Sequence, residues 1–100
     1  MKTEQLLQAA TQFGSPLFVY DAEKISHQYR RLTNAFSKVE RLQINYAVKA
    51  LSNVSILKLF HQLGAGLDTV SIQEVQLGLK AGVSPHKIIF TPNGVSLDEI

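Results

Sequence analysis

Two segments near the start of the chain carry apolar residues at the spacing of a helix. The first follows Thr3, a residue type that caps helices, and is expected to end at the turn residues 14–16. The second follows Asp21, and its apolar positions recur at intervals of four, three and four residues, at Ile25, Tyr29, Leu32 and Phe36. The run of Leu, Phe, Val and Tyr at residues 17–20 predicts a strand between them. Residues 1–41 are therefore expected to form a helix, a strand and a helix.

A different periodicity begins at residue 42. Apolar residues there alternate with polar or small ones, which is the period of a strand, at Leu42, Ile44, Tyr46 and Val48. Two more short runs rich in strand-forming residues follow, at 67–70 and 87–91. We therefore expect three strands in residues 42–100.

Capping residues predict helices between and after these strands. Ser52 or Asn53 precedes an apolar run that ends at a pair of glycines. A serine followed three residues later by glutamate, which is the spacing of a capping box, occurs at 71–74 and again at 96–99. The helix behind the first of these pairs is expected to stop at Gly82. The chain is expected to end inside the helix behind the second.

The alternation of strands and helices predicts an α/β fold. Helical crossovers force neighbouring strands to run parallel, and parallel sheets are covered on both faces. Three strands and their helices leave edges and one face uncovered, so we expect the chain to be a piece of a longer protein. The period fits a doubly wound sheet and a (β/α)8 barrel equally well.

Composition excludes several function classes. Of the 100 residues, 45% are hydrophobic and 18% are charged, and the net charge of +2 is spread without a basic run, which argues against a nucleic-acid partner. There is no cysteine for a disulfide or zinc site, and the three histidines lie far apart, at 27, 61 and 86. Neither a signal core nor a run of about 20 apolar residues is present, so we expect a cytoplasmic protein without a membrane span.

Lys49 is the leading candidate for chemistry. It follows the alternating strand and lies between Val48 and Ala50, at the strand end where barrel enzymes place their active sites. An amine among apolar neighbours loses solvation of its charged form and becomes available to condense with an aldehyde such as pyridoxal phosphate. From spacing alone, a solvated loop lysine is the commoner reason for such a residue.

Other candidates are weaker. Asp68 falls near the end of the next predicted strand and could share the same mouth as Lys49, although from spacing alone a turn carboxylate or helix-entry charge is the commoner reason for such a residue. Glu74 is accounted for by its capping position. The glycines at 64–66 precede a strand, whereas the dinucleotide fingerprint needs glycines at a helix start. The turn at 92–94 lies on the correct side of a strand but is more simply a tight turn.

Four motifs in register make the chain recognisable. They are GSPLFVYD at 14–21, NYAVKA at 45–50, GLDTVSIQE at 66–74 and AGVSPHKIIFT at 81–91. Together they resemble the diaminopimelate decarboxylases, over nearly the whole chain from about residue 13. Several motifs in the same order and spacing are more specific than any one of them.

This resemblance implies a fold and a site. The family has an N-terminal (β/α)8 barrel that binds pyridoxal phosphate and a β-domain. Residues 17–20 would form a leading strand that joins the β-domain, and residues 42–100 would form the first three βα units of an incomplete barrel. Lys49 would be the catalytic, cofactor-bearing lysine, with Ala47 and Asp68 beside the cofactor. The family places its phosphate site and substrate-binding arginine later in the chain, so these 100 residues are not expected to catalyse alone.

The resemblance also implies a reaction. It is the decarboxylation of meso-diaminopimelate to L-lysine with release of carbon dioxide, by a homodimer that binds a small amino-acid substrate. Related barrel enzymes act on ornithine, arginine or carboxynorspermidine or are racemases, and in each Lys49 would have the same role. A non-catalytic pyridoxal-phosphate-binding barrel protein is a further alternative.

Overall fold

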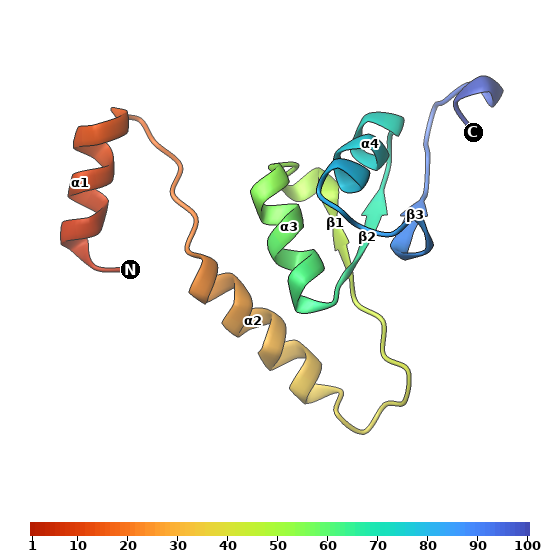
Figure 1. The fold of residues 1–100 in the computed structure, drawn as a ribbon, viewed down its shortest axis with the longest axis horizontal. Helices are drawn as coiled ribbons and strands as arrows, with labels where there is room; N and C mark the ends of the chain where they lie inside the picture. Colours follow the sequence, from red (N-terminus) through yellow and green to blue (C-terminus); the bar gives the residue numbers. More distant parts are fainter.

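The computed structural model describes all 100 residues, which form four helices, three strands and three short 3-10 turns (Figure 1). The elements are, in order, α1 (Thr3–Phe13), α2 (Ala22–Ala35), β1 (Asn45–Ala47), a 3-10 turn (Val48–Ala50), α3 (Val54–Leu63), β2 (Gly66–Thr69), α4 (Ile72–Lys80), a 3-10 turn (Pro85–Lys87), β3 (Ile88–Phe90) and a 3-10 turn (Leu97–Glu99). The predicted α/β alternation is confirmed. The last predicted helix is a single 3-10 turn, although its capping pair Ser96 and Glu99 is present.

The three strands form one parallel sheet in the order β1-β2-β3. Asn45 lies opposite Gly66 and Ala47 lies opposite Asp68, which in turn lies opposite Ile89. Every partner is 21 residues further along the chain, so each βα unit repeats at the same length. Residues at this spacing therefore lie at the same height along the sheet.

Helices α3 and α4 pack on one face of the sheet. The buried core consists of five residues contributed by both layers and the loop after α4: Val48, Leu57, Leu67, Ala81 and Val83. Tyr46 and Ile88 pack against this core from the outer strands. Because successive side chains of a strand point to opposite faces, Ala47, Asp68 and Ile89 project from the other face. Ile89 is 48% exposed there, because no element of the chain covers this face.

The helix starts follow the capping chemistry of the sequence. The Asp21 carboxylate accepts hydrogen bonds from the backbone N–H groups of Glu23 and Lys24. Asn53, rather than Ser52, caps α3 in the same way. The N-cap of α1 is Lys2, so the expected cap at Thr3 is wrong by one residue. The Asp21 and Asn53 side chains satisfy N–H groups that have no partner within their own helix.

The strand predicted at residues 17–20 is absent. The four residues connect α1 to α2, and no segment of the chain pairs with them. All four side chains are exposed, and Phe18 is 87% exposed. A strand requires the N–H and C=O groups of a neighbouring strand, so a β-rich composition alone does not produce one here. Strand β1 is likewise shorter than the predicted segment and begins at Asn45.

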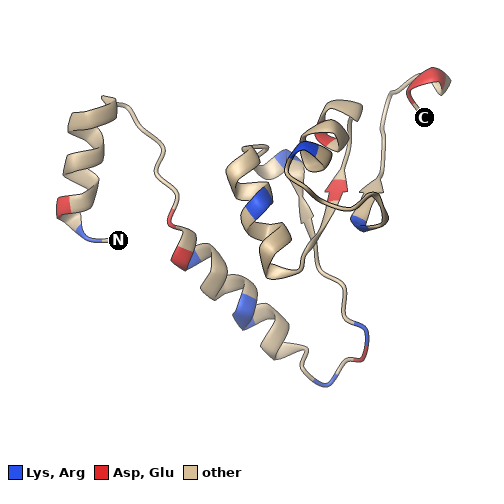
Figure 2. Ribbon diagram, in the orientation of Figure 1, with Lys and Arg blue, Asp and Glu red and all other residues tan.

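The N-terminal part extends away from the sheet. Figure 1 shows α1 apart from the sheet and α2 running past α3. The radius of gyration is 16.1 Å, above the roughly 13 Å of a compact domain of this length. Lys, Arg, Asp and Glu residues are scattered over the helices and loops of both parts (Figure 2). None of the helices is both long and apolar enough to cross a lipid bilayer.

Candidate active site

Lys49 lies directly past the carboxyl end of β1, in the middle of the 3-10 turn Val48–Ala50. The Val48 side chain is fully buried, whereas Lys49 is exposed, and the Leu51 N–H donates to the Val48 carbonyl oxygen over 3.1 Å. The apolar surroundings expected for Lys49 are therefore not found within this chain. The reason is local, because the turn directs Val48 into the core and Lys49 away from it.

Asp68 lies near the end of β2, and its carboxylate is held by the next strand. The Thr91 hydroxyl donates a hydrogen bond to Asp68 Oδ1 over 2.8 Å, and the Thr91 N–H donates to the Thr69 carbonyl oxygen over 2.8 Å. Asp68 is half-buried and forms no ion pair with Lys49. The sequence correctly places Lys49 and Asp68 near the carboxyl ends of neighbouring strands, but the contact of Asp68 is with Thr91.

Thr91 was missed by sequence reasoning, although a signal for it exists. It is a polar residue directly after a strand, as Lys49 is, and its strand repeats the 21-residue offset of the register. In such a sheet the carboxyl ends of parallel strands form one edge, where ligands bind. Ala47 completes this group as the residue opposite Asp68, with a side chain small enough to leave the space above it open. We call Ala47, Lys49, Asp68 and Thr91 the mouth residues.

Glu74 takes part in the N-terminal cap of helix α4. Its backbone N–H donates to Ser71 Oγ over 3.2 Å, and its Oε2 accepts from the Val70 N–H over 2.7 Å. The predicted capping pair is therefore present, but the reciprocal bond goes to Val70 in place of Ser71. These two hydrogen bonds join Glu74 to Val70 and Ser71, between β2 and α4. Glu74 therefore stabilises the loop that follows β2.

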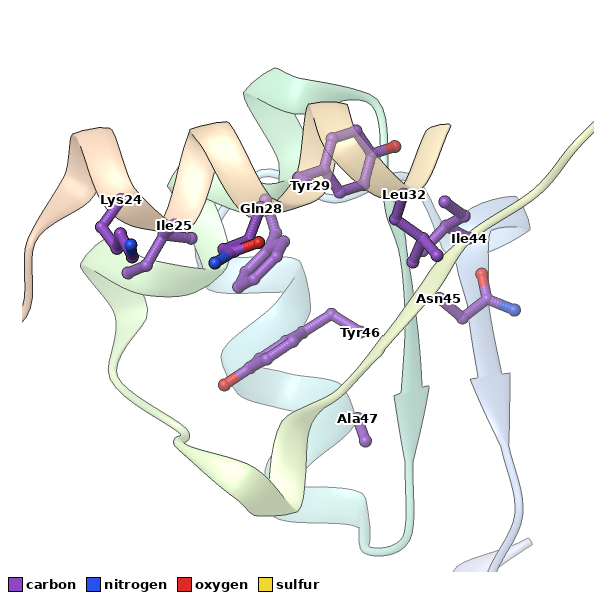
Figure 3. Close-up of a pocket in the computed structure, with 10 residues that line it drawn as sticks. Lys24, Ile25, Gln28, Tyr29, Leu32, Ile44, Asn45, Tyr46 and Ala47 are labelled. Atoms are coloured by element: carbon purple, nitrogen blue, oxygen red, sulfur yellow. The ribbon is translucent and has the colours of Figure 1, made fainter. Parts of the chain in front are cut away.

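An apolar groove lies away from these residues. A groove of about 420 Å³ runs along the free edge of β1, between this strand and α2 (Figure 3). Its ten lining residues include Tyr29, Tyr46 and Phe60, and seven of the ten are hydrophobic. Ala47 lines it, but Lys49 and Asp68 do not. The groove and the mouth residues are thus separate features that meet at β1.

The glycines at 64–66 have structural roles. Gly64 ends α3 in the left-handed region, with φ of 96°. Gly66 begins β2, and neither glycine begins a helix, which agrees with the rejection of a dinucleotide site.

Comparison with known proteins decides the family. Residues 22–100 match the family model described as "Pyridoxal-dependent decarboxylase, pyridoxal binding domain". The chain belongs to the pyridoxal-dependent decarboxylases. The family model thus covers α2, the sheet and all four mouth residues, and the resemblance found from the motifs is confirmed.

Relatives of this decarboxylase domain carry more specific names. A diaminopimelate decarboxylase of Helicobacter pylori (strain J99) is 44% identical over 97 residues, which cover 97% of this chain and 23% of the relative. The crystal structure of diaminopimelate decarboxylase from Helicobacter pylori complexed with L-lysine has a TM-score of 0.83 at 40% identity, covering 98% of this chain and 24% of that one. The crystal structure of lysine/ornithine decarboxylase from Vibrio vulnificus complexed with putrescine has a TM-score of 0.86 at 29% identity, covering 97% of this chain and 26% of that one. This chain therefore spans about a quarter of the length of the proteins it matches.

These structures confirm the predicted fold class, the N-terminal part of a pyridoxal-phosphate-binding barrel. The mouth residues fit the cofactor by their chemistry. Lys49 offers an exposed primary amine, which is the group that an aldehyde requires, and Asp68 offers a carboxylate held at the same edge of the sheet.

Proposed function

We propose that the protein carrying these residues converts meso-diaminopimelate to L-lysine and carbon dioxide, with pyridoxal phosphate attached to Lys49. The observation that carries this proposal is the level of identity. It is 44% and 40% to proteins named diaminopimelate decarboxylase, over almost the whole chain, and 29% to the lysine/ornithine decarboxylase. The L-lysine present in the Helicobacter pylori structure is the expected product.

Lys49 is proposed to hold the cofactor through its Nζ atom between turnovers. Its place in a turn past β1 leaves the amine free of ion pairs, so nothing within the chain competes for it. When bound, pyridoxal phosphate supplies an aldehyde and an electron-withdrawing ring that accepts the electron pair left by departing carbon dioxide. During the reaction one carbon–carbon bond of the substrate breaks, and a proton takes the place of the lost carboxyl group.

Asp68 and Ala47 are proposed to lie beside the cofactor. The Thr91 hydroxyl fixes one oxygen of Asp68, and the other remains available to a cationic group at the mouth. Ala47, opposite Asp68 in the register, leaves room for a flat ring against the sheet. Support for both roles comes from their position on the uncovered face of the sheet, at the same height as one another.

The division of the chain is also a proposal. Residues 42–100 are proposed to form the first three βα units of the barrel, and residues 1–41 to precede it. The separation of α1 from the sheet and the start of β1 at Asn45 support this boundary. We further propose a cytoplasmic homodimer, on the strength of the family resemblance.

The test uses the protein at its natural length, reconstituted with pyridoxal phosphate. Borohydride reduction followed by peptide mass spectrometry locates the lysine that carries the cofactor. Carbon dioxide and the product amine are then followed with meso-diaminopimelate, L-lysine and L-ornithine as substrates. Lys49→Ala is compared with Lys58→Ala, because Lys58 is an exposed lysine on the neighbouring helix α3.

Release of L-lysine from meso-diaminopimelate that is lost in Lys49→Ala and kept in Lys58→Ala supports the proposal. Turnover of L-lysine or L-ornithine in place of meso-diaminopimelate would move the function to the lysine/ornithine decarboxylases, whose Vibrio vulnificus member has a similar fold. Cofactor on Lys49 without turnover of any substrate would indicate a carrier. Cofactor on a different lysine would refute the role of Lys49.

A further inference from the structure

The turn that carries Lys49 is fastened from the helix side of the sheet. The Tyr46 hydroxyl donates a hydrogen bond to the Leu51 carbonyl oxygen over 2.9 Å. The Leu51 N–H donates to the Val48 carbonyl oxygen, and the Val48 side chain is fully buried in the core. Lys49 is therefore an exposed residue of a short segment whose two ends are both held.

The Tyr46 ring is itself fixed by aromatic packing. It stacks on Phe60 of α3, with centroids 4.1 Å apart and planes inclined by 14°. The Tyr29 ring of α2 meets Phe60 edge-on at 6.4 Å. Such pairs contribute beyond the apolar area they bury. The aromatic cluster of Tyr29, Tyr46 and Phe60 thus joins α2, α3 and β1, and Tyr46 is its member that reaches the turn.

Tyr46 points away from the mouth. It leaves β1 on the face that packs against the core, whereas Ala47 leaves it on the other face, and Figure 3 shows the two side chains projecting in different directions. Its phenol stays a hydrogen-bond donor, because burial raises the pKa of Tyr46 above its ordinary value of 10.0. Tyr46 can therefore influence chemistry at Lys49 only through the backbone.

We propose that Tyr46 is a positioning residue for Lys49. Its hydroxyl holds the Leu51 carbonyl, and this contact fixes the direction in which the turn presents the Lys49 amine. The inference rests on the proposed role of Lys49 as the residue that carries the cofactor. It assigns to a side chain in the helix layer a function in the site on the opposite face of the sheet.

The test compares Tyr46→Phe with Tyr29→Phe in the protein at its natural length, with pyridoxal phosphate as the probe. Tyr46→Phe keeps the stacked ring and removes only the hydroxyl. Tyr29→Phe is the same chemical change at a hydroxyl that forms no hydrogen bond within the chain. Four quantities are measured: amide hydrogen exchange of residues 48–51 in the apo protein, the dissociation constant for pyridoxal phosphate, kcat and KM.

For Tyr46→Phe we expect exchange at residues 48–51 to rise by roughly 3- to 10-fold, the range that follows from losing one hydrogen bond. The dissociation constant should rise and kcat should fall by a similar factor, with KM within about twofold of wild type because the substrate contacts are untouched. Tyr29→Phe should leave all four quantities within about twofold of wild type. Unchanged exchange in Tyr46→Phe would overturn the proposal, and so would faster exchange with unchanged affinity and kcat.

The variant Phe60→Leu distinguishes a loss of global stability from a loss of positioning, because it weakens the aromatic stack and keeps the Tyr46 hydroxyl. If affinity falls in proportion to Tm in both Phe60→Leu and Tyr46→Phe, the role of Tyr46 is only structural and the proposal fails. Failure of the proposed function is distinct, because it shows in the wild-type protein as cofactor on another lysine or as no release of lysine. If wild-type Lys49 carries no cofactor, the positioning role falls with it.

Discussion

The Thr91 hydroxyl lies 2.8 Å from Asp68 Oδ1 and donates a hydrogen bond to it, which ties the residue after β3 to the carboxyl end of β2. The two residues are 23 positions apart in sequence and meet because the strands are parallel neighbours. The contact fixes one oxygen of a carboxylate at the edge of the sheet where Lys49 also lies.

Thr91→Val is expected to weaken cofactor binding. Valine has the shape of threonine but cannot donate to Asp68, and a hydrogen bond to a charged group contributes about 1.5–3 kcal/mol. The dissociation constant for pyridoxal phosphate should rise roughly tenfold or more, measured by titration in the protein at its natural length. Thr91→Ser retains the hydroxyl and should bind within about twofold of wild type. Equal affinity in the valine variant would show that Asp68 needs no partner.

Gly66→Ala is expected to destabilise the sheet by about 1–3 kcal/mol through overpacking. A Cβ atom at Gly66 would fall 2.7 Å from the Lys87 carbonyl oxygen and would also collide with the Asn45 side chain. The double variant with Asn45→Ala should recover only part of the loss, because the backbone oxygen cannot move aside. Denaturant unfolding of the single and double variants measures this. Full recovery would contradict the backbone contact.

Leu57→Ala is expected to cost about 2–5 kcal/mol of unfolding free energy. Leu57 is fully buried and belongs to the core that joins α3 to the sheet. Leu97→Ala is the matched control, because Leu97 is 89% exposed and its truncation should stay within about 0.5 kcal/mol. Similar effects of the two truncations on the unfolding midpoint would be incompatible with this core.

Asp21 is expected to titrate below its ordinary pKa of 3.8. The backbone N–H of Lys24 is the main cause of the lowered pKa, and the Met1 amino group, 3.3 Å from Oδ2, lowers it further. Because the folded-state pKa is depressed, the stabilising effect of the cap is present above the unfolded value and is lost as the pH falls through the folded value. An NMR titration of the Asp21 carboxyl measures this. Acetylation of the N-terminus should raise the midpoint only part of the way, and a midpoint at or above 3.8 in the free chain would contradict the cap.

Sequence periodicity and capping residues predicted the barrel-like part of the chain well. The predicted segment 67–70 is offset by one residue from β2, the segment 87–91 contains β3, and Asn53 and Ser71 cap the helices between the strands. These features are local, because a capping side chain accepts a hydrogen bond from a backbone N–H only two or three residues away. The order of the strands then follows from the short crossovers between them.

The features that failed depend on partners distant in sequence. Residues 17–20 have the composition of a strand, but a strand is defined by the neighbour that pairs with it, and none of the other 96 residues does so. The expected pairing of residues 17–20 with the β-domain stays a prediction. The exposure of Lys49 could not be read from its apolar neighbours, because the 3-10 turn sends Val48 and Lys49 in different directions. The partner of Asp68 also required the register, which places Thr91 beyond its neighbouring strand. The site roles of Lys49, Ala47 and Asp68 stay predictions for the experiments above.

The alternation of side chains across the sheet separates the residues that pack in the core from those that face the proposed site. Tyr46, Leu67 and Ile88 serve the core, while Ala47, Asp68 and Ile89 next to them lie on the uncovered face. Substitutions at Ala47, Asp68 and Ile89 therefore leave the packing of the helix-side core unchanged. The insertion or deletion of one residue within a strand would exchange the two sets at once, whereas the loops between the elements can change in length without that penalty.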